Sequence, residues 1–168
     1  MRVLLIAFVF LPVSCTLTVP QFDSLSRFFT VLNGSADKIQ HETSPTWLAR
    51  IDQYGAVLKP FASGELVVFA NSEGDAIAFD GWVIRSITGF GLNAPMSIVG
   101  KDGNRTFVVD NTVLKVVCDP WVWEETRWTQ SCTNGTGVIT LNEQKEIQFI
   151  SMPLVEDFGE LTLRLFNE

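Results

Sequence analysis

The sequence has few of the residues that most often bind metals or cofactors. Its 168 residues include one histidine, His41, and three cysteines. His41 lies in a polar segment with no cysteine or second histidine at metal-ligand spacing, so we expect a solvated loop residue and no metal site. No Gly-rich phosphate-binding loop precedes a helix pattern, and we expect no cofactor.

Catalytic arrangements are also scarce. Serines, His41 and several aspartates are present, but no serine lies in a strand-turn-helix nucleophile elbow. The adjacent carboxylates Glu124-Glu125 and Glu156-Asp157 could do acid–base chemistry, yet such pairs in turns are usually solvated charge. We therefore predict that the protein is not an enzyme.

Clustered positive charge is missing as well. The net charge is -7 and lysines and arginines are scattered, which argues against nucleic acid as a partner and against electrostatic binding of anionic headgroups. Beyond residue 15 no apolar run reaches the roughly 20 residues of a membrane span. With 46% hydrophobic and 18% charged residues, residues 16–168 predict a single folded domain.

The first fifteen residues have the order of an export signal. Met1-Arg2 form a short basic start, residues 3–13 are apolar, and Ser14-Cys15 form a small-residue cleavage site. Lipoprotein processing would leave a lipid-bearing Cys15, although Pro12 stands where that signal usually has leucine. Ordinary cleavage after Cys15 is the alternative. Either route predicts a protein that works outside the cytoplasm.

The other two cysteines form an even pair. Disulfides persist in exported proteins, so we expect Cys118 and Cys132 to bridge, with two reduced and buried cysteines as the alternative.

The intervening segment predicts a hairpin centred on Glu125. Position 118 would lie opposite 132, 122 opposite 128, and 123 opposite 127. One face then carries the disulfide, and the other carries Trp121 and Trp123, with Arg127 placed for a cation–π contact with Trp123. Trp121, Trp123 and Arg127 are the candidate recognition residues if this face meets solvent. The alternative is that the rings pack as core.

The rest of the chain alternates short apolar runs with turn signals. Residues 21–32 have near-helical spacing behind Pro20 and predict one short N-terminal helix, followed by a polar loop. Ten segments then predict strands: 46–52, 65–70, 76–79, 82–88, 96–99, 105–109, 112–117, 137–141, 146–151 and 160–166. The sharpest turn is Asp80-Gly81. We expect a mainly β fold, an antiparallel sandwich or open barrel with one helix against it.

Three Asn-x-Ser/Thr sequons fall in turn-like segments, at Asn33, Asn104 and Asn134. In a eukaryotic secreted protein they would be surface glycosylation sites. In a bacterial protein they carry no such meaning.

Several of these segments together resemble a known family. A signal ending in Ser14-Cys15, then WLARID, and then GELVVFANSEGDAIAFDGWVIRSITGFG are similar to the YjbF/GfcB family of bacterial exopolysaccharide and capsule lipoproteins. The shared features are the LVVFA strand, the Asp80-Gly81 turn, the strand with Arg85, and the Gly89-Phe90-Gly91 close. The tail KEIQFISMPLVEDFGELTLRLF resembles the closing pair of strands.

The resemblance implies a non-catalytic β-rich lipoprotein, anchored through Cys15 to the periplasmic side of the outer membrane. It would take part in exopolysaccharide or capsule secretion or assembly, with polysaccharide or secretion proteins as partners. Two alternatives remain open from the residues. One is a carrier that holds a lipid or another apolar ligand in an open barrel. The other is a eukaryotic secreted domain that recognises glycans or proteins.

Overall fold

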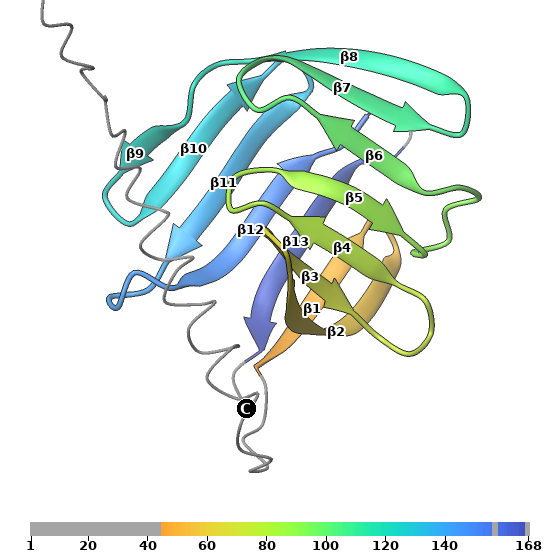
Figure 1. The fold of residues 1–168 in the computed structure, drawn as a ribbon. Coiled ribbons are helices and arrows are strands. Elements are labelled where there is room, and N and C mark those ends of the chain that lie inside the picture. The colour runs from red at the N-terminus through yellow and green to blue at the C-terminus, as the bar shows by residue number, and fades with distance from the viewer. Residues whose placement is uncertain (1–44, 156–157, 167–168) are drawn as a thin grey trace, which may run out of the picture.

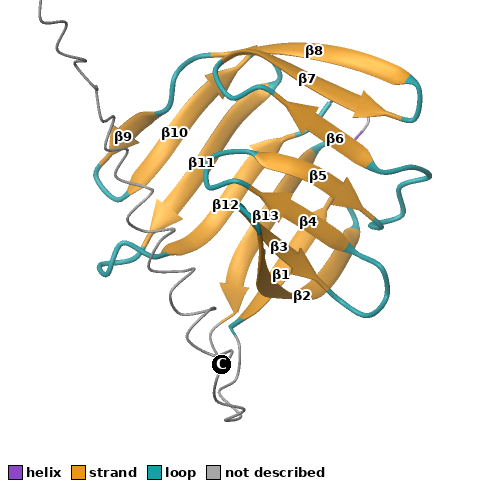
Figure 2. Cartoon of the chain, viewed as in Figure 1, coloured by secondary structure: helices purple, strands orange, loops and turns teal. Residues whose placement is uncertain are grey.

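The computed structural model describes residues 45–155 and 158–166, and these residues form an almost entirely β structure (Figure 2). The thirteen strands, in chain order, are β1 (Thr46–Ile51), β2 (Tyr54–Ser63), β3 (Leu66–Ala70), β4 (Ala76–Phe79), β5 (Ile84–Thr88), β6 (Met96–Val99), β7 (Gly103–Val109), β8 (Thr112–Cys118), β9 (Val122–Glu124), β10 (Arg127–Cys132), β11 (Gly135–Leu141), β12 (Ile147–Pro153) and β13 (Glu160–Phe166). The predicted mainly β, antiparallel class is confirmed.

The strands form one sheet that closes on itself as a barrel (Figure 1). Strands β1 to β8 are paired in sequence order, the last strand β13 pairs with β1, and β12 and β11 follow. Strand β10 joins β11 to β8 and completes a circuit of twelve strands. Strand β9 lies outside this circuit and pairs with β10 alone.

The side-chain alternation of the strands separates a packed interior from an outer face. One row across β11, β12, β13, β1 and β2 is buried throughout and consists of Ile139, Ile150, Leu163, Ala49 and Ala56. The adjacent row on the opposite face consists of Thr140, Phe149, Arg164, Leu48 and Val57. Large rings fill the interior, as in the edge-on contact of Trp47 with Phe69 at 5.0 Å between ring centroids.

Strand β2 is absent from the sequence-based prediction. Its ten residues contain Gly55 and Pro60, which interrupt a β pattern. In the structure the turn is made by Asp52 and Gln53, with Asp52 at a φ of 50°. Proline is tolerated in this strand although it donates no hydrogen bond.

The sharp turn at Asp80-Gly81 is longer than the sequence predicts. We expected a strand from Trp82, but β5 begins at Ile84. The Asp80 amide bonds to the Val83 carbonyl at 3.2 Å, and the Asp80 carboxylate accepts hydrogen bonds from the amides of Trp82 and Val83 at 2.9 and 2.7 Å. This turn keeps Trp82 out of the ladder and leaves its ring free to enter the barrel.

Two sequence predictions lie outside the described residues, namely the export signal with Cys15 and the helix over 21–32. Within residues 45–155 and 158–166, no helix has both the length and the apolar character needed to cross a membrane.

Candidate functional site

Four of the five tryptophans gather at one end of the barrel. The buried ring of Trp82 contacts Trp128 at 5.2 Å and Trp121 at 5.9 Å, and Trp128 contacts Trp123 at 5.1 Å between centroids. The ammonium of Lys101 lies 4.0 Å from the Trp82 ring centroid, a cation–π contact. Residues 82, 121, 123 and 128 are called the tryptophan cluster below.

The members of the cluster differ in exposure. Trp121 and Trp128 are half-buried, whereas Trp123 is 43% exposed. The Trp121 ring lies over Gly137 of β11. A Cβ atom added to Gly137 would lie 3.2 Å from Trp121 Cη2. The sequence left two readings open for Trp121 and Trp123. In the structure Trp121 packs against neighbouring residues, whereas the ring of Trp123 faces solvent.

The predicted hairpin register is wrong by one residue near its tip. Cys118 does lie opposite Cys132, but Trp123 lies opposite Trp128, and Arg127 lies opposite Glu124. Two residues, Glu125 at a φ of 53° and Thr126, form the turn. Asp119 to Trp121 interrupt the strand, so the register set by the cysteines does not continue to the tip.

Arg127 consequently has a different neighbour from the one we expected. Its guanidinium forms an exposed ion pair with Glu124 at 3.3 Å. The cation that meets a tryptophan ring is Lys101 rather than Arg127. The candidate recognition residues therefore lie together at one hairpin, and their role stays a prediction.

The residues that carried the family resemblance hold the cluster in place. The Arg85 guanidinium binds Asp80 Oδ2 through Nε at 2.7 Å and Nη2 at 2.6 Å, and Nη1 donates to the Gly100 carbonyl at 3.0 Å. One end of this unit fixes the turn that carries Trp82, and the other fixes the turn that carries Lys101. Both donors reach the same carboxylate oxygen, and such charge-assisted hydrogen bonds are shorter and stronger than neutral ones.

A buried polar network lies beside the cluster. Arg105 of β7 is 1% exposed, and it donates to the side-chain oxygen of Gln130 and, at 3.0 Å, to the Lys101 carbonyl. Gln130 Nε2 donates to the carbonyl of Asp119 at 2.7 Å. The network connects the β6–β7 turn, β7, the β8–β9 segment and β10. Burial lowers the pKa of Arg105, the positive charge of Arg85 adds to this, and Asp102 and Asp80 oppose it.

Sequence reasoning did not identify Trp82, Lys101, Arg105 or Gln130 as site residues. Each is a single residue within a strand or a turn, and only the closure of the barrel brings them together. The one usable signal was a tryptophan directly after an Asp-Gly turn.

The predicted disulfide is present and closes the barrel. Cys118 and Cys132 are bonded, and they are the single residue pair through which β8 and β10 are neighbours. Backbone hydrogen bonds flank them, from Asp119 N to the Ser131 carbonyl at 2.8 Å and from Thr133 N to the Val117 carbonyl at 2.9 Å. We call this junction the seam.

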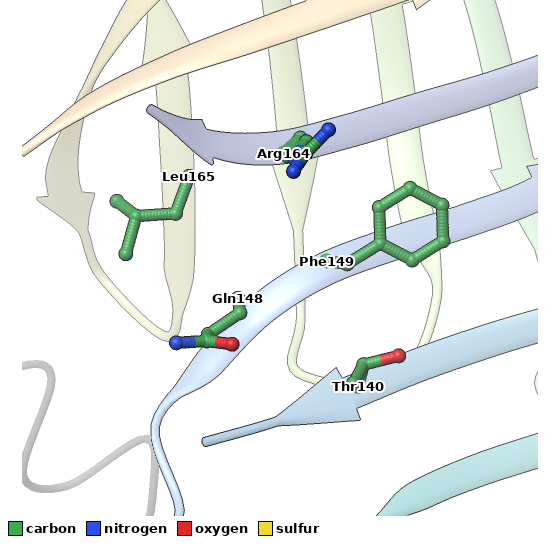
Figure 3. Close-up of a pocket in the computed structure, with 5 residues that line it drawn as sticks. All are labelled: Thr140, Gln148, Phe149, Arg164 and Leu165. Atoms are coloured by element: carbon green, nitrogen blue, oxygen red, sulfur yellow. The ribbon is translucent and has the colours of Figure 1, made fainter. Parts of the chain in front are cut away.

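Two hollows lie on the outer face at the end of β13, on either side of Arg164. The first, of about 330 Å³, is lined by Thr140, Gln148, Phe149, Arg164 and Leu165. Figure 3 shows the side chains of Phe149, Arg164 and Thr140 on neighbouring strands. The second, of about 320 Å³, shares Arg164 and Leu165 and adds Leu48 and Phe166. Both hollows are open to solvent.

The residues considered for metal binding and glycosylation lie partly within the described segments. No group of three or more His, Cys, Asp or Glu side chains placed to hold a metal occurs in the described segments, and His41 lies outside them. Of the sequons, Asn104 is exposed, whereas the Asn134 amide donates to the carbonyls of Pro153 and Leu154 at 3.2 and 2.9 Å. Asn33 is not among the described residues.

Comparison with known proteins gives one informative result. No protein-family model and no curated protein sequence matches the chain. A solved structure, that of the hypothetical lipoprotein YmcC from Escherichia coli (K12), is similar with a TM-score of 0.54. The two chains share a fold. The likeness covers 90% of this chain and 96% of YmcC at 10% sequence identity, so it concerns the architecture of nearly the whole of both chains.

Proposed function

We propose that this protein is a bacterial envelope lipoprotein that takes part in exopolysaccharide or capsule secretion or assembly without catalysing a reaction. The observation that carries the proposal is the barrel fold shared with a chain described as a lipoprotein, over nearly the full length of both. Ser14-Cys15 after an apolar run supplies the attachment residue, and the motif around Asp80 and Arg85 supplies the family resemblance.

The anchor would be the thioether-linked lipid on Cys15. Each buried CH₂ contributes about 0.8 kcal/mol, so several acyl chains hold a protein on a membrane without a spanning segment. The proposed position is the periplasmic face of the outer membrane, with polysaccharide or secretion proteins as partners. Nucleic acid is an unsuitable partner for a chain with a net charge of -7.

Two surfaces have the chemistry to contact a saccharide. The exposed ring of Trp123 can stack on the apolar face of a sugar. The first hollow beside Arg164 combines Phe149 with a guanidinium, an amide and a hydroxyl. A guanidinium can form two parallel hydrogen bonds with the carboxylate of an acidic sugar. An acyl carrier is less well supported, because the barrel interior is filled by core side chains and the two hollows beside Arg164 are open to solvent.

Two measurements test the proposal. Cells expressing the full chain are labelled with palmitate, and we expect label in the wild type and none in Cys15→Ala. Deletion of the gene should reduce secreted polysaccharide, and expression of the wild-type chain should restore it. An unlabelled wild-type chain contradicts the anchor, and unchanged polysaccharide on deletion contradicts the role in secretion.

A further inference from the structure

Strand β8 has an edge that the barrel does not use. It pairs with β7 along its whole length, from Thr112 to Cys118. On its other side it meets β10 only at Cys118 and Cys132, so within the described residues the edge from Thr112 to Lys115 has no partner strand. Unpaired edges of β-rich sequence readily accept another strand.

The hydrogen bonds at the seam show which groups this edge presents. The Val117 carbonyl accepts from Thr133 N at 2.9 Å, and Val117 N donates to Thr133 Oγ1 at 3.3 Å, so the main chain of Val117 points away from β7. Residues two apart in an antiparallel strand point the same way. The amides and carbonyls of Val113 and Lys115 therefore face the unused edge.

The edge borders a hollow of about 740 Å³. Its walls are Leu114, Lys115 and Val116 of β8 on one side and Thr133, Asn134, Leu154, Val155 and Gly159 on the other. Val116, Leu154 and Val155 are buried, whereas Leu114 is 41% exposed. The hollow therefore has apolar residues in both of its walls, next to the free main-chain groups of the edge.

We infer that this edge is a docking site for one extended segment of a partner protein, which adds to β8 as a further strand. Main-chain bonds to Val113 and Lys115 would give affinity, and the apolar walls would take alternate side chains of the segment. Lys115 is the one charged residue among the described lining residues, so the segment should carry a carboxylate opposite it.

The shape of the hollow favours a single segment over a second copy of this chain. A second copy would present its own β8 with β7 hydrogen-bonded behind it, and neighbouring strands lie about 4.8 Å apart. The wall formed by Asn134, Leu154 and Val155 faces the edge and leaves the hollow bounded on both sides. A lone extended segment has no such second strand to accommodate. This inference goes beyond the proposed function and does not depend on saccharide binding.

The experiment uses the full chain purified in detergent and a fluorescent, end-blocked peptide, Thr-Val-Thr-Glu-Thr-Val-Thr. Anisotropy measures its binding, and amide hydrogen exchange reports on Val113 and Lys115. We expect saturable binding that slows exchange at these two amides. Val113→Pro removes one edge amide without touching the β7 ladder and should weaken binding about ten-fold, in line with the loss of a hydrogen bond. Val113→Thr keeps the amide and should bind as the wild type does.

Reversing the charge at position 115 tests the predicted pairing of Lys115 with a carboxylate of the segment. Lys115→Glu should bind the Glu peptide more weakly and a peptide with central Lys more tightly. The inference is overturned if neither peptide binds at about 1 mM, a level at which even weak recognition is detectable. It is also overturned if Val113→Pro binds as well as Val113→Thr, or if the wild-type chain forms a dimer that Val113→Pro abolishes, since the occupant is then a second copy.

Discussion

The indole of Trp121 occupies the space that a side chain at Gly137 would fill. A Cβ atom at position 137 would lie 3.2 Å from Trp121 Cη2, which is closer than ordinary contact. The absence of a side chain on β11 is therefore what admits a ring from the segment between β8 and β9. The Trp121 ring in turn packs against the Trp82 ring, with 5.9 Å between the two ring centroids.

Gly137→Val should displace Trp121 and loosen the tryptophan cluster. Overpacking of a filled site typically costs about 1–3 kcal/mol, and we expect a loss in that range in urea unfolding, with a shift of tryptophan fluorescence. Thr136→Val, an exposed neighbour on the same strand, is the control and should stay within about 0.5 kcal/mol of the wild type. Equal stability of the two variants would show that the Trp121 ring does not depend on the space at Gly137.

Replacing Cys118 and Cys132 together by alanine should open the seam. The disulfide closes a loop with a sequence separation of 14, and a loop of about 15 residues corresponds to a loss of about 3 kcal/mol. Because one residue pair joins β8 to β10, we expect amide exchange to rise first at Asp119 and Thr133, whose amides flank it. Uniform acceleration that reached the β1–β2 pair equally would argue against a local seam.

The exposure difference within the tryptophan cluster predicts two different outcomes. Trp128→Ala removes a ring that contacts both Trp82 and Trp123, and it should cost about 3 kcal/mol or more. Trp123→Ala removes a ring that is 43% exposed and should leave the melting temperature nearly unchanged while weakening binding to a glycan or secretion partner. Similar losses of stability in both variants would place Trp123 in the core as well.

Two arginine–carboxylate pairs should differ in their contribution to stability. Arg85→Ala removes a partly buried ion pair with Asp80 and a bond to the Gly100 carbonyl, so we expect a loss of about 2 kcal/mol by chemical unfolding. Arg127→Ala breaks a pair whose side chains are 56% and 49% exposed, and such pairs contribute at most about 1 kcal/mol. A larger loss in Arg127→Ala than in Arg85→Ala would contradict this order.

Features that depend on local sequence pattern, such as strands and turns, were predicted from the sequence. Contacts that form only when the barrel closes were not. Alternation of apolar residues between turn signals identified most of the strands, and the pairing of Cys118 with Cys132 was predicted because they form an even pair in a chain expected to be exported. Strand β2 was missed because Gly55 and Pro60 are unfavourable in strands and interrupt its β pattern. Its buried residues include Ala56 and Leu58.

The candidate site was predicted less well than the fold. The hairpin at β9 and β10 was found, but the break at Asp119 to Trp121 shifted its register, and this moved Arg127 away from Trp123. The contact of Trp82 with Trp128 joins the β4–β5 turn to β10, and that of Arg105 with Gln130 joins β7 to β10 across β8. No spacing in the sequence encodes such contacts, since they arise only when the sheet closes.

The pairing of β1 with β13 sets the order in which the protein can fold. Thr46 lies opposite Phe166, so the first described strand, which already pairs with β2, gains its second neighbour only when the last described residues are present. Contacts of such high sequence separation slow folding, because a long loop must close before they form. An amino-terminal fragment keeps the β1–β2 pair but lacks β13, so one side of β1 stays unpaired until the carboxyl-terminal strand is available. Closure of the barrel is therefore a late step that needs both ends of the described chain.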